Sequence, residues 1–130
     1  MKIYIMRWIA ALLLICGPVN AQFFGSDYTV KDVKTGTTWL RCSVGQAWDS
    51  SRETCTGDII KLNQDEILIA LTEAKKQLGG DWRLPSRKEL MGLICNECEP
   101  PKINSKYFPN LSAEAYWTGD KNWMNPRTLW

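Results

Sequence analysis

The chain has 130 residues, of which 45% are hydrophobic and 23% are charged, with a formal net charge of +2 and no histidine. This composition is ordinary for one globular domain and excludes collagen-like, coiled-coil and intrinsically disordered proteins. The absence of histidine removes the commonest general base and the commonest metal ligand, so serine triads, zinc-protease helices and imidazole proton shuttles are excluded.

Residues 1–21 have the pattern of a secretory signal peptide. Two basic residues precede an apolar run at residues 8–16, which is too short to cross a bilayer that needs about 20 helical residues. Small residues lead up to a cleavage point after Ala21, so we expect secretion or export to the periplasm or cell envelope. Two alternatives stay open: a retained membrane anchor, and a lipoprotein attached through Cys16, which the bulky Ile15 disfavours.

Cleavage after Ala21 changes the charge balance of the chain. Of the 16 basic residues two lie in the signal peptide, so 14 remain beside 14 acidic residues and the net charge becomes zero. A neutral domain has no bulk attraction for nucleic acid or anionic membranes. We therefore expect no nucleic-acid partner, and no membrane span after signal cleavage.

We expect residues 22–27 to be a linker and residues 28–130 to be one domain. The domain begins with an alternation of apolar and polar residues that predicts a strand at 28–33. Turn residues around Gly36 separate it from a second predicted strand at 37–41, so the start is predicted to be a β-hairpin. The residues that follow, 43–58, are predicted to form a polar loop.

The clearest predicted element is a helix that starts after Asn63. Asn63 can cap this helix and Glu66, three residues later, can complete a capping box. Apolar residues then recur at helical spacing up to Leu78, and Gly79-Gly80 ends the run with a predicted left-handed cap. We expect the apolar stripe of this helix to pack onto a sheet.

A second helix is predicted to start after Ser86, with Glu89 at the third position of its capping box. Leu90, Leu93 and Ile94 are expected to form its buried side. Residues 102–130 are rich in aromatic and turn residues and predict a loop followed by one or two short strands. The predicted fold class is therefore α+β: an N-terminal hairpin, two helices and short C-terminal strands.

Four cysteines remain after signal cleavage: Cys42, Cys55, Cys95 and Cys98. An even number in a small exported domain indicates disulfides, and three pairings are possible. We favour Cys42–Cys55, which brackets a loop, together with the local pair Cys95–Cys98. A redox pair would need its first cysteine at a helix N-terminus, whereas this pair follows a helix and has acidic neighbours. A four-cysteine zinc site would show two CxxC knuckles and only one exists, so we expect no metal and no cofactor.

Several segments, in the same order along the chain, resemble a known family. They are Thr35-Gly36, Trp39 to Cys42, Gly45-Gln46, Trp82-Arg83-Leu84-Pro85, Phe108-Pro109 and Tyr116-Trp117-Thr118. Over roughly residues 28–118 the chain resembles the Lcl C-terminal domain family, named for the C-terminal domain of a bacterial collagen-like adhesin. The Trp-Arg-Leu-Pro segment in front of a Glu-Leu helix is its most specific piece.

The resemblance implies an exported bacterial module whose architecture is related to C-type-lectin-like folds and which adheres to sulfated polysaccharides. It implies structural roles for the Trp-Arg-Leu-Pro motif, with Trp39, Trp82 and Trp117 in the core and with Arg83 paired to an acidic group or a carbonyl inside the fold; Leu84 and Pro85 complete that motif. The calcium-binding Glu-Pro-Asn triplet of true C-type lectins is absent, because Glu99-Pro100-Pro101 lacks the amide ligand.

Members of the family continue past the Tyr-Trp-Thr segment for several more strands, whereas this chain stops twelve residues beyond Thr118. We therefore expect a domain that is incomplete at its C-terminus, with an unpaired sheet edge and an apolar sheet surface that lacks its cover. Such an edge favours homo-oligomers or pairing with a strand from a partner.

Three functions follow from these patterns. The first is a module that binds glycans or sulfated polysaccharides through basic residues, which are Arg83, Arg87 and Lys88 with Lys75 and Lys76. The second is a structural envelope protein that docks a partner strand, or a non-functional remnant. The third is an enzyme, which we do not expect because no nucleophile and base stand together in the sequence.

Overall fold

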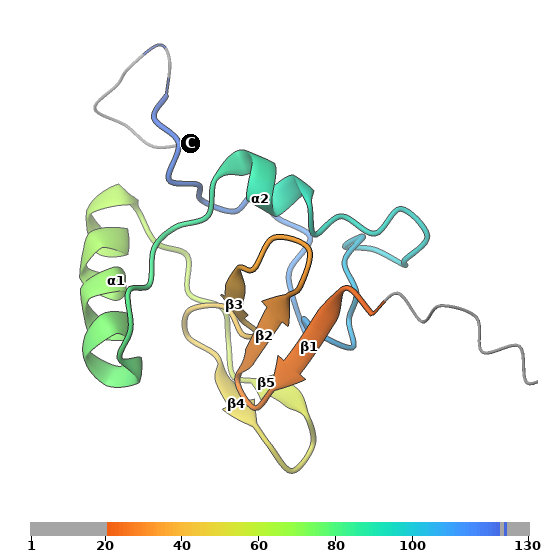
Figure 1. Cartoon of the computed structure of the whole chain (residues 1–130). Coiled ribbons are helices and arrows are strands. Elements are labelled where there is room, and N and C mark those ends of the chain that lie inside the picture. The colour runs from red at the N-terminus through yellow and green to blue at the C-terminus, as the bar shows by residue number, and fades with distance from the viewer. Residues whose placement is uncertain (1–20, 123, 125–130) are drawn as a thin grey trace, which may run out of the picture.

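The computed structural model describes residues 21–122 and 124, so the predicted signal peptide lies outside the described residues except for Ala21. Five short strands come first in the chain and two helices follow (Figure 1). The strands are β1 (Phe23–Ser26), β2 (Thr29–Asp32), β3 (Thr38–Leu40), β4 (Ala47–Asp49) and β5 (Thr54–Thr56), and the helices are α1 (Gln64–Leu78) and α2 (Arg87–Met91). The α+β class is as predicted.

Strands β1, β2 and β3 form an antiparallel sheet with β2 in the centre. The predicted hairpin is confirmed, because β2 pairs with β3 with Val30 opposite Trp39. The predicted linker is wrong: residues 23–26 form β1, which pairs with the other side of β2 and places Gly25 opposite Val30. Only Phe23 of β1 is partly buried, so this edge strand lacks the alternation that would have identified it.

A second hairpin, β4 with β5, replaces the polar loop predicted at residues 43–58. At its tip the Asp49 carboxylate accepts hydrogen bonds from the Ser51 main-chain N–H at 2.9 Å and the Ser51 hydroxyl at 2.6 Å. The hydrogen bond from the Ser51 hydroxyl, followed by those from the main-chain N–H groups of Arg52 and Ser51, favours the charged carboxylate and lowers the pKa of Asp49. A turn that is stabilised by its own side chains can join two strands of only three residues each. Such strands are too short to show the alternation of apolar and polar residues that predicts a strand.

Both helices begin as predicted. The Asn63 side chain accepts from the Glu66 main-chain N–H and the Glu66 carboxylate accepts from that of Asn63, which is a complete capping box. Ser86 and Glu89 form the same reciprocal pair in front of α2. Helix α1 ends at Gly79 with φ 68° and ψ 179°, a positive-φ conformation outside the left-handed helical region that was predicted.

The hydrophobic core is small. It consists of Val30, Leu93 and Phe108, with partly buried neighbours that include Trp39 and Leu90. The predicted buried side of α2 is wrong in one position, because Ile94 is 54% exposed and instead forms an isolated antiparallel bridge with Ile103. Among the described residues neither helix is long and apolar enough to cross a membrane.

Helix α1 does not pack onto a sheet, and that prediction is wrong. Its main chain makes no close contact with either sheet, and Ile67 is its only buried residue. After α2 the described residues form no strand, so the one or two short strands expected within residues 102–130 are not found there, and residues 115–118 are irregular. Two hydrogen bonds connect residues 117–119 to the rest of the chain. The Gly119 N–H donates to the Pro85 carbonyl at 2.8 Å, and the Trp117 indole N–H donates to the Leu62 carbonyl at 2.9 Å.

Candidate functional site

An apolar groove of about 1490 Å³ separates α1 from β3 and the core. In Figure 1 α1 lies to one side of β3, and the segment that follows α1 runs back along the helix toward α2. The apolar side chains of its walls include Trp39, Leu40, Ile67, Ala70, Leu71, Ala74, Trp82, Leu84, Leu90, Leu93, Phe108, Leu111 and Trp117. The apolar groove therefore lies where the stripe of α1 was expected to meet a sheet.

The rim of the groove includes an unpaired strand edge. The Asp32 N–H of β2 donates to the Thr37 carbonyl at 2.8 Å, and the Arg41 N–H donates to the carbonyl of Tyr28, just before β2, at 3.0 Å. Bonded positions alternate in an antiparallel ladder, so Trp39 also faces β2. Thr38 and Leu40 consequently direct their N–H and C=O groups away from β2, and both residues line the groove. Within the described residues β3 is therefore an edge strand of the first sheet, as is β1.

The groove walls also contain side-chain donors without acceptors. Within the described part of the chain, the buried polar atoms that have no hydrogen-bond partner are the indole nitrogens of Trp39, Trp48 and Trp82 and the hydroxyl of Ser43. All of these residues except Trp48 line the groove. Buried donors without partners are uncommon in folded proteins, so this wall is less well satisfied than an ordinary core.

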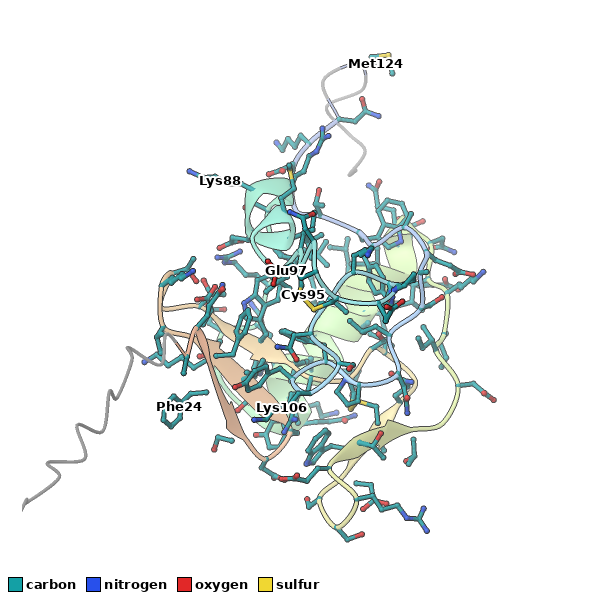
Figure 2. All side chains as sticks on the ribbon, turned by 90° about the vertical axis from the view of Figure 1, so that its right-hand side faces the viewer. Phe24, Lys88, Cys95, Glu97, Lys106 and Met124 are labelled. Atoms are coloured by element: carbon teal, nitrogen blue, oxygen red, sulfur yellow. A yellow bond between two sulfur atoms is a disulfide. The ribbon has the colours of Figure 1, made fainter. Side chains whose placement is uncertain are left out.

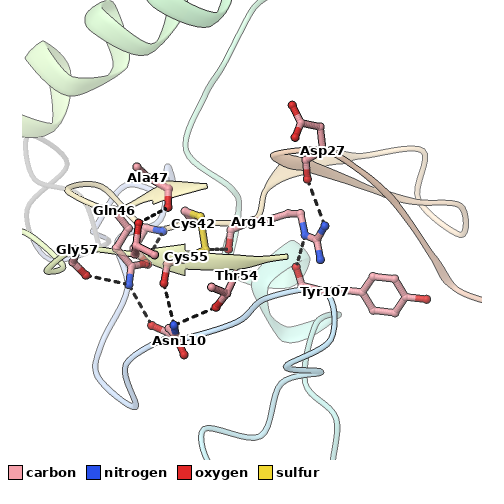
Figure 3. Close-up of a disulfide and its surroundings, with 12 residues drawn as sticks. Asp27, Arg41, Cys42, Gln46, Ala47, Thr54, Cys55, Gly57, Tyr107 and Asn110 are labelled. Carbon is pink, nitrogen blue, oxygen red and sulfur yellow. Dashed lines mark hydrogen bonds between the residues drawn. A yellow bond between two sulfur atoms is a disulfide. The ribbon is translucent and has the colours of Figure 1, made fainter. Parts of the chain in front are cut away.

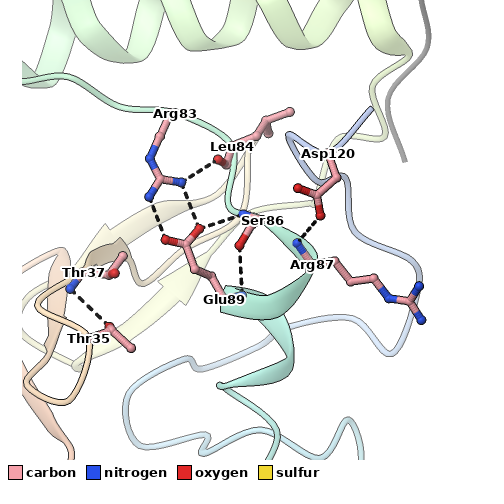
Figure 4. Close-up of polar contacts among 8 residues, drawn as sticks. All are labelled: Thr35, Thr37, Arg83, Leu84, Ser86, Arg87, Glu89 and Asp120. Carbon is pink, nitrogen blue, oxygen red and sulfur yellow. Dashed lines mark hydrogen bonds and ion pairs between the residues drawn. The ribbon is translucent and has the colours of Figure 1, made fainter. Parts of the chain in front are cut away.

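The basic residue of the Trp-Arg-Leu-Pro motif is held by an acidic one, as the resemblance implied. Arg83 binds the Glu89 carboxylate through two nitrogens, at 2.7 and 2.9 Å, and donates to the Leu84 carbonyl at 3.0 Å (Figure 4). The pairing is confirmed, but the Arg83 side chain is 63% exposed rather than inside the fold. The Arg83 hydrogen bonds and the main-chain N–H of Ser86 lower the pKa of Glu89 to about 2, and Glu89 raises the pKa of Arg83.

The basic residues proposed to bind polyanions are not gathered in one place. Lys75 lies near the C-terminal end of α1 and forms an ion pair with Asp81 at 2.8 Å, which lowers the pKa of Asp81. Helix α2, which contains Arg87 and Lys88, lies at the far end of the segment that follows α1 (Figure 1). Lys75 and its neighbour Lys76 are therefore separated from the basic residues of α2.

Arg87 and Lys88 remain as a smaller candidate pair. Both are exposed, and Lys88 projects outward from α2 (Figure 2). The guanidinium of Arg87 is directed away from the Arg83–Glu89 pair (Figure 4). The main-chain N–H of Arg87 donates to the Asp120 carboxylate at 2.7 Å, which brings one negative charge close to this pair.

The structural importance of Arg41 was not predicted. This arginine is 7% exposed and donates to the Lys106 carbonyl at 2.8 Å. It also donates to the carbonyls of Tyr107 at 3.0 Å and Asp27 at 3.2 Å (Figure 3). Its guanidinium also lies 3.9 Å from the centroid of the Trp48 ring. Burial lowers the pKa of Arg41, although Glu53 and Asp27 act in the opposite direction. No sequence signal indicates these contacts, because Tyr107 is 66 residues away.

Both favoured disulfides are present. Cys42–Cys55 joins the end of β3 to β5, and Asn110 donates to the Cys55 carbonyl at 2.7 Å beside it (Figure 3). Cys95–Cys98 closes a local turn after α2 (Figure 2). The main chain of that turn is held by Lys102, whose ammonium donates to the Cys98 carbonyl at 2.7 Å. The four cysteines are thus cross-links between main-chain segments.

The three tryptophans implied to be core have different positions. Trp39 is half-buried and packs against the core cluster. Trp82 is half-buried, but in a groove wall and outside that cluster. Trp117 is 36% exposed, so its implied core position is wrong. Leu84 and Pro85 are half-buried and also line the groove, so the motif shared with the family is largely a groove wall.

Comparison with protein families identifies the family of this chain, because the model of the Lcl C-terminal domain matches residues 28–130. The chain belongs to the Lcl C-terminal domain family. No curated protein and no solved structure matches it. In this Lcl C-terminal domain the most specific family segment, Trp82 to Pro85, lies against the apolar groove. Within the described residues no group of three or more cysteine, aspartate or glutamate side chains is placed to hold a metal ion.

Proposed function

We propose that this Lcl C-terminal domain is a non-catalytic binding module of the bacterial cell envelope, and that the apolar groove is its binding surface. The observation that carries the proposal is the apolar stripe of α1, which is mostly half-buried and lines the groove instead of packing onto a sheet. Contiguous exposed apolar surface of this kind marks sites of interaction. The groove volume of about 1490 Å³ exceeds the 300–1,000 Å³ typical of small-molecule pockets, which favours a macromolecular partner.

The envelope location is supported by the cysteines. Two disulfides in a small domain fit an oxidising compartment, such as the periplasm or the cell exterior. A non-catalytic role is supported by the absence of histidine from the sequence and by the four cysteines being paired, which leaves no thiol among them to act as a nucleophile.

Site-specific photo-cross-linking in the producing bacterium tests this function. A benzophenone amino acid replaces Leu71, which lines the groove, and in a matched control it replaces Leu68, which is 59% exposed and does not line it. We expect one discrete adduct from position 71 and none from position 68, with the partner segment identified by mass spectrometry of the cross-linked peptides. Equal cross-linking from both positions, or none from position 71, would reject the groove as the binding surface.

Adhesion to sulfated polysaccharides is a second candidate function, and the unpaired side chains of Arg87 and Lys88 favour it. Arginine and lysine donate charge-assisted hydrogen bonds to sulfate, and the described residues offer these two side chains no ion pair. The test is salt-dependent retention on immobilised heparin. The double variant Arg87→Glu with Lys88→Glu should elute at lower salt, whereas Lys31→Glu with Lys34→Glu, which changes the charge equally, should elute like the parent. Equal elution of the two double variants would reject this site.

A further inference from the structure

The two disulfides of this domain differ in how easily a reagent can reach them. In Cys42–Cys55, Cys55 is 2% exposed and its sulfur lies 3.5 Å from the Arg41 carbonyl oxygen. Cys95 and Cys98 are both half-buried, and the two residues between them are exposed. We propose that Cys95–Cys98 is a site of thiol–disulfide exchange, which an external dithiol reduces while the domain remains folded and the other disulfide remains intact.

The turn that contains Cys95 and Cys98 is also held by contacts that do not involve the sulfur atoms. The Cys95 N–H donates to the Lys102 carbonyl at 2.8 Å, and next to this bond Ile94 and Ile103 form an antiparallel bridge. The disulfide closes a loop with a sequence separation of only 3, so it constrains the unfolded chain less than a disulfide that closes a long loop. The fold therefore tolerates the loss of this sulfur–sulfur bond.

One cation is fixed in this turn. The Lys102 ammonium donates to the Cys98 carbonyl at 2.7 Å and to the Asn96 carbonyl at 3.4 Å. A positive charge beside a cysteine favours its thiolate. Glu97 and Glu99 have the opposite effect, but in the described part of the chain no hydrogen bond holds either carboxylate in place. Cys98 is therefore the better leaving group, which makes the sulfur of Cys95 the one that is attacked.

Cys95 also borders a space through which a reductant can approach. A cavity of about 680 Å³ lies between the start of the first sheet and this turn, and its lining includes Phe23, Tyr107, Cys95 and Glu97. Figure 2 shows Cys95 and Glu97 in the turn beyond α2. Exchange requires direct contact between a thiolate and a disulfide sulfur, and exposed disulfides are the ones that exchange readily.

The proposed exchange is a two-electron reduction of the domain. A thiolate of the dithiol attacks Sγ of Cys95 and forms a mixed disulfide, and Cys98 leaves as a thiolate that takes up a proton. The second thiolate of the dithiol attacks its own sulfur in the mixed disulfide, and Cys95 leaves and takes up a proton. The dithiol becomes a disulfide, having lost two electrons and two protons. The chain supplies the disulfide that is attacked, so it needs no low-pKa nucleophile and no helix N-terminus in front of Cys95.

Reduction would affect one end of the apolar groove, because Ile94, Lys102 and Ile103 belong to its lining. The hydrogen bond between Cys95 and Lys102 should open more often once the covalent constraint is removed. We therefore expect the Cys95 amide proton to exchange faster in the reduced domain. The exchange reaction itself does not depend on what the groove binds.

Reduction of the folded protein by dithiothreitol tests the proposal. Samples are quenched with acid at intervals, unfolded and alkylated, and peptide mass spectrometry then locates the free thiols. We expect Cys95 and Cys98 to become free at least about tenfold faster than Cys42 and Cys55, with an unchanged circular dichroism spectrum. Equal rates for the two disulfides, or unfolding that accompanies the reduction of Cys95–Cys98, would overturn the proposal.

Two sets of variants examine the steps of this argument. Lys102→Gln should slow the reduction of Cys95–Cys98 about twofold or more, whereas Lys31→Gln, which removes an exposed charge on β2, should leave the rate unchanged. Equal rates in these two variants would overturn the assignment of Cys98 as the leaving group. The double variant Cys95→Ser with Cys98→Ser should fold with the other disulfide formed, and its failure to fold would overturn the exchange site. No partner is needed in these measurements, so their failure is distinguishable from failure of the groove as a binding surface.

Discussion

The strand region and the helical region of this domain are stabilised in different ways. In the strand region, two hydrogen bonds from Arg41 and two from Asn110 join residues 23–58 to the segment 104–110. A third hydrogen bond from Arg41 and one disulfide cross-link residues 23–58 among themselves. In the helical region, residues 59–94, the helices are capped well but their apolar side chains line an open groove. The domain therefore combines a cross-linked scaffold with an uncovered apolar wall.

This difference explains how a chain with a small core can keep the apolar groove open. Apolar contacts alone are not directional and would favour collapse of the groove. Hydrogen bonds from a buried guanidinium fix the distance and orientation of the segments they join. A partner that enters a groove held in this way does not have to order its walls, which lowers the free-energy cost of binding.

The largest effect on the scaffold is expected from Arg41→Met. The substitution leaves the carbonyls of Asp27, Lys106 and Tyr107 without their donor in a buried setting. We expect the free energy of unfolding in urea to fall by about 3–5 kcal/mol. Arg52→Met is the matched control, because the Arg52 side chain is 76% exposed, and it should cost less than about 0.5 kcal/mol. Equal effects of the two variants would show that the scaffold does not depend on the Arg41 contacts.

The two disulfides should differ in how much each stabilises the fold, because they close loops of different length. Cys42–Cys55 has a sequence separation of 13 residues and Cys95–Cys98 a separation of 3. In the chain-entropy model their contributions are about 3 and about 2 kcal/mol. The double serine variant of the first pair should therefore unfold at lower urea than that of the second. A larger loss from the second pair would place the main covalent constraint in the turn that follows α2, outside the strand region, contrary to the comparison.

Truncation of one apolar residue in each region sharpens the contrast. Val30 is completely buried in the core, and Val30→Ala should lower the free energy of unfolding by about 2–3 kcal/mol. Leu71 is half-buried in the groove wall, and Leu71→Ala should cost less than about 1 kcal/mol in the free protein because water already reaches its side chain. Denaturation curves of the two variants measure this difference. A loss of more than 2 kcal/mol in Leu71→Ala would mean that the groove is closed in solution.

The features that could be predicted from the sequence are local. Each capping box requires two residues three positions apart, such as Ser86 and Glu89, and both boxes formed as predicted. The pairing of Cys95 with Cys98 and the hairpin of β2 with β3 also depend on short separations. In these cases the interacting groups and the turn between them lie within one short stretch of sequence, so the physical argument is complete.

The candidate site could not be predicted, because its properties depend on what is distant along the chain. The spacing of Ile67, Leu71 and Ala74 shows which face of α1 is apolar, but not what covers that face. The same limit applies to Arg41, whose partner Tyr107 is 66 residues away. The basic residues of α1 and α2 looked like one patch in the sequence, whereas Lys75 is neutralised by Asp81 and lies at the other end of the connecting segment from α2.

The smallest expected effect concerns the ion pair at the groove rim, and it depends on pH. The pKa of Glu89 is lowered from 4.5 to about 2 in the folded protein, so the carboxylate stabilises the fold fully above about pH 4.5 and loses this contribution as the pH falls toward 2. Because the Arg83 side chain is 63% exposed, solvent screening limits the contribution to about 1 kcal/mol at neutral pH. Glu89→Gln should therefore be about 1 kcal/mol less stable than the parent at pH 7 and equally stable near pH 2. Glu73→Gln on the outer surface of α1 controls for the loss of one negative charge, and a stability difference for Glu89→Gln that persists unchanged at pH 2 would show that the pair with Arg83 is not its source.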